Sequence, residues 1–194
     1  MTSSLAAFPE NSPSGLSADA HRVSARQLLL AVPAAERDIY VLHQRVWEQI
    51  DASVAIRTHR PDILYRRDRG CVTIRISGVA LRHGLPDSLT TEAGQVRRFS
   101  LQCALWRDLG RQRQSPLARL RDLLDNAGCQ LLDHRISMGV SSGYKSRIGA
   151  TIHLPVADVH GALLVVDQQR LHDAWRLGIG RGRRFGFGML VLQP

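Results

Sequence analysis

The chain has 194 residues, of which 44% are hydrophobic, so a packed core can form and a globally disordered protein is excluded. Its formal net charge is +9, which favours a polyanionic partner because each neutralised phosphate releases a counterion. Lys145 is the only lysine among the 26 basic residues, and arginine is the side chain that forks onto phosphates and guanine edges. A solvated basic surface is the alternative explanation of this charge.

Several classes of site have no support in the sequence. Cys71, Cys103 and Cys129 lie far apart with no C-x-x-C pair, so neither a zinc site nor a disulfide framework is indicated. No group of His, Cys, Asp and Glu has the spacing of metal ligands, and we expect neither a metal nor a cofactor. No apolar run approaches the ~20 residues of a membrane span, and no signal-peptide pattern is evident. We therefore expect a cytoplasmic protein without a membrane partner.

The first half of the chain begins with residues 1–20, which are rich in Ser, Ala and Pro and are predicted to be a flexible extension. A strand, a helix and two further strands follow, over residues 24–32, 34–50, 63–66 and 71–77. Residues 79–95 are predicted to be irregular, with at most a short helix after Pro86.

The second half begins with an alternating strand over residues 98–105. Ser115-Pro116 then predicts a helix start and Gly128 its end, and Asp167 and Gly178 bracket a second helix in the same way. Further strands are predicted over residues 130–138, 147–154, 161–166 and 187–192. Residues 139–146 are predicted to be a loop at the tip of a hairpin.

This order of elements predicts an α+β protein with two ferredoxin-like, RRM-like halves packed side by side. We place the boundaries at 1–20 for the extension, 21–95 for the first half and 96–194 for the second half. The first half is less regular, because its second helix cannot be found in the sequence. The fold alone licenses no function.

The most specific segment is the glycine-rich loop, residues 178–188, with the sequence GIGRGRRFGFG. It contains five glycines and three arginines, but neither G-x-G-x-x-G nor a Walker A sequence. We favour a basic loop whose amides and arginines hold an RNA backbone, and a tight structural turn with exposed charge is the alternative.

The first predicted helix contains a second candidate site. His43 lies three residues after Tyr40 and four before Trp47, so these side chains share one side of the helix. A histidine there can titrate near neutrality and move protons. A half-buried surface histidine without a function is the alternative.

The glycine-rich loop and the final segment GFGMLVL together resemble the signature of the CRISPR repeat-processing endoribonucleases, and of their CasE branch most closely. The helix segment RDIYVLHQRVW (37–47) resembles that branch's first-helix motif, and LYRRD (64–68) is a weaker match. The resemblance implies that Tyr40 and His43 correspond to the active-site pair. It also implies metal-independent cleavage of RNA stem-loops, in which the ribose 2′-hydroxyl attacks the adjacent phosphate to leave a 2′,3′-cyclic phosphate and a 5′-hydroxyl.

The RNA-binding residues are predicted from basic charge and from glycine-rich backbone. In the loop they are Gly180, Arg181, Gly182, Arg183, Arg184 and Gly186. Elsewhere they are Arg66, Arg67, Arg97, Arg98, Lys145 and Arg147. His134 and His153 are further candidates, placed on strands where they face RNA or each other.

The expected function is therefore an endoribonuclease that cleaves stem-loops in CRISPR repeat transcripts and keeps the product within a CRISPR effector complex. One alternative is a non-catalytic RNA-binding subunit of the same fold. A basic ribosome-associated RNA-binding protein is a second alternative.

Overall fold

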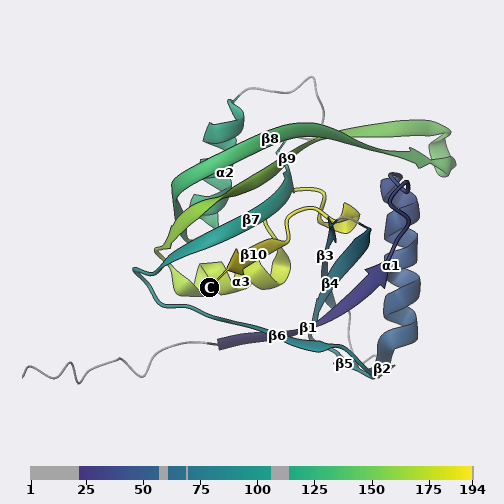
Figure 1. Cartoon of the computed structure of the whole chain (residues 1–194), viewed down its shortest axis with the longest axis horizontal. Helices are drawn as coiled ribbons and strands as arrows, with labels where there is room; N and C mark the ends of the chain where they lie inside the picture. The colour runs from purple at the N-terminus through teal and green to yellow at the C-terminus, as the bar shows by residue number, and fades with distance from the viewer. Residues whose placement is uncertain (1–21, 57–60, 69, 106–113, 194) are drawn as a thin grey trace, which may run out of the picture.

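The structure is a computed structural model that describes residues 22–56, 61–68, 70–105 and 114–193. Two four-stranded antiparallel sheets, each with helical cover, form the molecule (Figure 1). This arrangement confirms the predicted α+β class with two ferredoxin-like halves. The expected extension at residues 1–20 lies outside the described residues.

The first sheet has the strand order β3-β4-β1-β6 and is covered by the helix α1. Its elements, with the small β2–β5 ladder beside it, are β1 (Arg22–Ala31), α1 (Ile39–Ser53), β2 (Val54–Ile56), β3 (Asp62–Asp68), β4 (Cys71–Ser77), β5 (Ala80–Leu81) and β6 (Leu85–Thr90). The helix begins at Ile39, later than predicted, because Asp38 caps it. The prediction of an irregular stretch or short helix after Pro86 is wrong, since β6 pairs with β1 there.

The second sheet has the order β10-β7-β9-β8, which is the strand order of a complete ferredoxin-like unit. Its elements are β7 (Val96–Ala104), α2 (Pro116–Asn126), β8 (Cys129–Lys145), β9 (Ala150–Val165), α3 (Gln168–Leu177) and β10 (Leu190–Gln193). The predicted caps hold, because the side chains of Ser115 and Asp167 each accept a backbone N–H at a helix start.

The β8–β9 hairpin is longer than the sequence indicated. The segment 139–146, predicted to be a loop, continues β8 to Lys145, and the chain turns only at the 3₁₀ helix Ser146–Ile148. The separate strand predicted at 161–166 is the end of β9. Figure 1 shows this hairpin projecting past the second sheet and ending beside the start of α1.

Polar contacts join the two halves. Arg75 of β4 is almost fully buried, and its guanidinium donates to Asp87 at 2.7 Å and to the carbonyls of Trp175 and Leu190 at 3.0 and 3.1 Å. Arg66 of β3 donates to the Ser100 hydroxyl of β7 at 2.6 Å. These bonds fix the halves relative to each other, and they therefore fix any site whose residues come from both.

Within the described residues, no helix combines the length and the apolar character needed to cross a membrane. The division of the chain at residues 95 and 96 remains our proposal for its domain organisation.

Candidate active site

The helix α1 presents His43 at the edge of its buried face. The buried stripe of the helix consists of Ile39, Leu42, Val46 and Ile50, which pack toward the sheet. His43 is half-buried, next to that stripe, and its ring lies 6.2 Å from the ring of Trp47 one turn later. The helix therefore holds the imidazole in place while leaving part of it open to solvent.

The hydroxyl group beside His43 belongs to Tyr65 of β3. The Tyr65 Oη lies 3.5 Å from His43 Nδ1, and the two rings stack with centroids 6.4 Å apart. The same Oη donates a hydrogen bond of 2.6 Å to the backbone carbonyl of Arg184 in the glycine-rich loop. Because its proton is committed to that carbonyl, the phenol oxygen offers a lone pair to Nδ1–H. We assign to His43 the tautomer with the proton on Nδ1, in which Nε2 is the nitrogen that accepts a proton.

The glycine-rich loop closes over Tyr65. Gly186 has φ of +87°, and a Cβ on it would lie 2.7 Å from the Tyr65 ring, so a side chain at this position would be strained and would clash. Gly180 and Gly182 also have positive φ, at +75° and +76°. The short 3₁₀ turn Arg183–Phe185 lies between Gly182 and Gly186. The loop's backbone is thus built to approach α1 and β3 closely.

A cleft of about 420 Å³ opens at His43, and we call it the His43 cleft. Its lining includes His43, Trp47, Tyr65, Arg176, Arg183 and Arg184. Arg183 donates to the Leu177 carbonyl at 2.8 Å, whereas the Arg184 guanidinium lies 4.6 Å over the ring of Phe185. Both arginines are exposed, so their positive charge is accessible from solvent beside the imidazole.

The environment of His43 favours its neutral form. Burial is the largest influence and lowers the pKa of the imidazole below its ordinary value of 6.5. The Arg184 carbonyl opposes this shift by accepting a hydrogen bond from the ring, and the Arg184 charge adds to it. His43 is therefore neutral at pH 7, which is the state that a general base requires.

Tyr40 occupies a different place from Tyr65. Its ring packs edge-on against Phe185 with centroids 5.0 Å apart. Its hydroxyl is buried and has no hydrogen-bond partner within the described part of the chain. The expected catalytic role of Tyr40 stays a prediction.

Asp38 joins the start of α1 to the β8–β9 hairpin. Its Oδ1 accepts from the amides of Tyr40 and Val41, and its Oδ2 accepts from the amide of Tyr144 at 2.8 Å. Burial alone would raise the pKa of Asp38, but these three hydrogen bonds lower it overall. Gly143 allows the contact, because a Cβ there would lie 2.6 Å from the side chain of Ile39.

The predicted RNA-binding residues occupy more than one surface. Lys145 and Arg147 lie at the end of the hairpin, beyond the Asp38 contact, and Arg147 is exposed. Arg181 is exposed on the loop, and its backbone forms a bridge with Ala104. The hairpin end and the glycine-rich loop flank the start of α1 from two sides.

The arginines on strands have partners of their own. Arg66 is used in the junction between the halves, and Arg67 donates to the carbonyls of Pro33 and Ala34. Arg97 donates to the Thr90 carbonyl, and Arg98 is exposed on β7. Their roles in RNA binding remain predictions.

His134 and His153 do not face each other. The register pairs His134 with Gly161 and His153 with Ser142, so the two lie far apart along the hairpin. Among the described residues, no group of three or more His, Cys, Asp or Glu side chains is arranged to hold a metal ion.

Sequence reasoning missed Tyr65 and Asp38 as parts of this site. Tyr65 lies 22 positions from His43, and no local spacing connects them. Asp38 carries the ordinary signal of a helix N-cap, which the predicted start at residue 34 concealed.

Solved structures show where this fold occurs elsewhere. Thermus thermophilus Cse3, bound to an RNA representing a pre-cleavage complex, aligns with a TM-score of 0.66 and 20% identity over 88% of this chain and 99% of that chain. Cas6e from Escherichia coli K-12 aligns with a TM-score of 0.58 and 20% identity over 89% of this chain and 100% of that chain. This chain has the Cse3 and Cas6e fold.

Other comparisons agree. A chain of a CRISPR RNA-guided surveillance complex aligns with a TM-score of 0.57 and 19% identity, over 88% of this chain and 98% of that chain. A family model described as CRISPR-associated protein matches residues 124–194, which contain the glycine-rich loop. A search of curated protein sequences finds no match. The resemblance to the CRISPR endoribonucleases that the sequence indicated is thus confirmed at the level of the fold.

Proposed function

We propose that this protein is a metal-independent endoribonuclease that binds stem-loops in CRISPR repeat RNA and cleaves them, with His43 as the general base. The observation that carries the proposal is the His43 cleft. In it, an imidazole that is neutral at pH 7 contacts the Tyr65 hydroxyl through Nδ1 and lies beside two exposed arginines. The Cse3-like fold supports the choice of substrate, because Cse3 has been solved in complex with RNA.

The reaction needs a base, a positioned phosphate and compensation of negative charge. In our proposal His43 takes the proton of a ribose 2′-hydroxyl, and the 2′-oxygen then attacks the adjacent phosphorus. The bond from phosphorus to the 5′-oxygen breaks, and that oxygen takes up a proton. The products are a 2′,3′-cyclic phosphate and a 5′-hydroxyl. Arg183 and Arg184 offset the negative charge that grows on the phosphate oxygens.

Tyr65 acts as a positioning residue in this proposal. Burial raises its pKa, so the phenol stays protonated and keeps donating to the Arg184 carbonyl. Its oxygen then orients His43 through Nδ1. Because Tyr65 bonds both the loop and the histidine, it ties the position of the loop arginines to that of the base.

The charge of the chain and its hairpin support stem-loop binding. Lys145 and Arg147 lie at the end of a projecting element, where they can reach the phosphates of a stem whose cleavage point lies at His43. We also propose that the protein keeps its RNA product within a CRISPR effector complex, which the alignment with a chain of a surveillance complex supports.

The test compares the wild type with His43→Ala on a labelled repeat stem-loop in excess EDTA. The variant should lose cleavage and keep its affinity within a few-fold, since a neutral side chain adds little to phosphate binding. His83→Ala is the matched control, because His83 is exposed and does not line the His43 cleft, and it should cut at the wild-type rate. Tight binding by the wild type without any cleavage would favour a non-catalytic RNA-binding subunit instead.

A further inference from the structure

A second cleft lies on the other face of the glycine-rich loop, and we call it the inter-sheet cleft. It encloses about 530 Å³ and is lined by residues of both halves, from β3 and the start of α1 to β7, β8 and β9. Arg183 and Arg184 line the His43 cleft, whereas Phe185, Gly186 and Phe187 line the inter-sheet cleft. One short segment of backbone therefore separates the proposed reaction centre from this second space.

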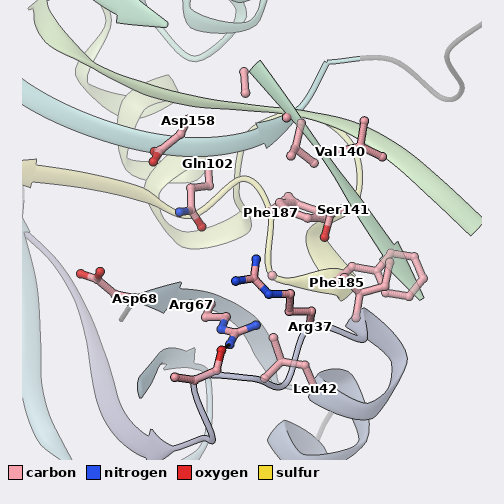
Figure 2. A pocket seen from close by; sticks show the side chains of 16 residues that line it. Arg37, Leu42, Arg67, Asp68, Gln102, Val140, Ser141, Asp158, Phe185 and Phe187 are labelled. Carbon is pink, nitrogen blue, oxygen red and sulfur yellow. Dashed lines mark hydrogen bonds between the residues drawn. The ribbon is translucent and has the colours of Figure 1, made fainter. Parts of the chain in front are cut away.

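Several polar side chains converge on the inter-sheet cleft. Figure 2 shows Arg37 reaching into it, with Gln102 on one side and Arg67 on the other. The side chains of Arg37, Gln102 and Ser141 make no hydrogen bond or ion pair within the described ranges. Arg67 differs, because the carbonyls of Pro33 and Ala34 hold it at 3.3 and 2.9 Å. Among the described residues, the cleft thus combines an arginine held by backbone carbonyls, an arginine without a partner, an amide and a hydroxyl.

The rest of the lining is apolar on one side and also includes two carboxylates. Phe187, Ile39 and Leu42 are buried side chains that form an apolar wall. Asp68 and Asp158 also line the cleft, and carboxylates repel phosphates but accept hydrogen bonds from exocyclic amines of bases. This distribution suits a ligand with one anionic group and one flat, hydrogen-bonding ring. A run of duplex phosphates would meet the two carboxylates.

We propose that the inter-sheet cleft binds one unpaired nucleotide of the RNA, immediately flanking the stem. Its phosphate contacts Arg37 and Arg67, and its base lies along the Phe187 wall with Gln102 and Ser141 at its polar edge. A volume of about 530 Å³ falls within the ordinary range of ~300–1,000 Å³ for small-ligand sites. The inference rests on the proposed function, because the loop shared by the two clefts connects the flank to the cleavage point.

The position of the loop makes this site part of substrate choice. The Phe185 ring lies 6.1 Å from the ring of His43 and also lines the inter-sheet cleft. A nucleotide seated there would press on the same loop that carries Arg184 and its carbonyl. Stems that carry the flanking nucleotide would therefore be held more tightly than bare stems.

The test uses RNAs with a 2′-deoxy substitution at the cleavage point, so that binding is measured without reaction. Three ligands are compared by equilibrium binding: the bare stem-loop, the stem-loop with a flank on one side, and the stem-loop with a flank on the other side. In the wild type one flank should increase affinity, and an abasic flank should lose part of the gain.

Arg37→Ala and Gln102→Ala should each weaken binding of that flanked RNA about tenfold and leave the bare stem-loop within twofold. Arg82→Ala is the matched control, because it removes an exposed arginine that does not line the cleft. Thermal melting should show that all three variants remain folded.

The inference is overturned if neither flank adds affinity in the wild type, or if Arg37→Ala weakens the bare and the flanked RNA equally. Failure of the proposed function looks different, since unsubstituted repeat RNA would then remain uncut by the wild type. Normal cleavage with no flank effect rejects the inter-sheet cleft alone.

Discussion

Removal of the Tyr65 hydroxyl by Tyr65→Phe tests the geometry around His43 without changing the volume of the side chain. The hydroxyl makes a hydrogen bond of 2.6 Å to the Arg184 carbonyl and lies 3.5 Å from His43 Nδ1. A buried hydrogen bond contributes about 1 kcal/mol, and the carbonyl left behind adds a desolvation cost that its remaining contact with His43 reduces. We expect a loss of about 1–2 kcal/mol in the free energy of unfolding.

That loss corresponds to a fall in Tm of about 3–6 °C for a chain of this size. Cleavage should slow as well, because the variant loses both the contact that orients His43 and the hydrogen bond that holds the glycine-rich loop at Arg184. We expect the single-turnover rate at saturating enzyme to fall about tenfold, equivalent to ~1.4 kcal/mol of transition-state stabilisation, with Kd changed less than twofold. The measurements are calorimetry for Tm and a quenched time course with labelled RNA for the rate.

Tyr40→Phe is the matched control, because it also removes one tyrosine hydroxyl, but from a tyrosine that does not contact His43 through that group. The Tyr40 hydroxyl is buried without a partner in the described structure, so its removal should leave Tm unchanged or raise it slightly. Wild-type Tm and rate in Tyr65→Phe, combined with loss of cleavage in Tyr40→Phe, would refute this reasoning. That result would assign the catalytic hydroxyl to Tyr40, as the sequence motif implies.

Three further predictions follow from the site. Because the pKa of His43 is lowered, the rate should rise with pH along an acid limb whose midpoint lies below 6.5, and a midpoint above 6.5 would contradict a buried base. Gly186→Ala should lower Tm and slow cleavage, because its φ is +87° and its Cβ would meet the Tyr65 ring; wild-type behaviour would show that the loop adjusts freely. Lys145→Ala and Arg147→Ala should weaken stem-loop binding, and each should reduce the slope of log Kd against log salt by about one. Unchanged salt slopes would place the hairpin end outside the RNA-binding surface.

Much of the second half was predictable because its signals are local. The helix starts are marked by Ser115-Pro116 and Asp167, and the helix ends by Gly128 and Gly178. Each of these capping signals depends only on residues a few positions away. Together with the alternating strands, these signals gave the order of elements of a ferredoxin-like unit, which the strand order confirms.

The hairpin and β6 were not predictable in this way, for different reasons. Ser141, Ser142 and Gly143 have the composition of a turn, yet all three lie in β8 and pair with β9. Position 143 requires glycine because the start of α1 leaves no room for a side chain there. Pro86 is typical of a turn, but β6 is an edge strand of the first sheet, where proline is tolerated. In both cases the deciding contact comes from a distant part of the chain.

The candidate site likewise contains residues that local sequence identifies and residues that only tertiary packing brings together. A motif of neighbouring residues identified His43. The glycines of the loop indicated backbone conformations with positive φ, which the structure shows at Gly180, Gly182 and Gly186. The partner of His43 could not be inferred, because only the packing of β3 against the loop brings Tyr65 to it. The polar lining of the inter-sheet cleft depends likewise on residues from both sheets.

The most direct test of the central claim is cleavage of a repeat stem-loop that carries a single 2′-deoxyribose 5′ to the scissile phosphate. If His43 activates the 2′-hydroxyl, the wild type should bind this RNA with normal affinity and leave it uncut in EDTA. The all-ribose RNA should be cut in the same buffer, and its product should end in a 2′,3′-cyclic phosphate. Cleavage of the deoxy-substituted RNA, or a product with a 3′-hydroxyl, would contradict the proposed role of His43.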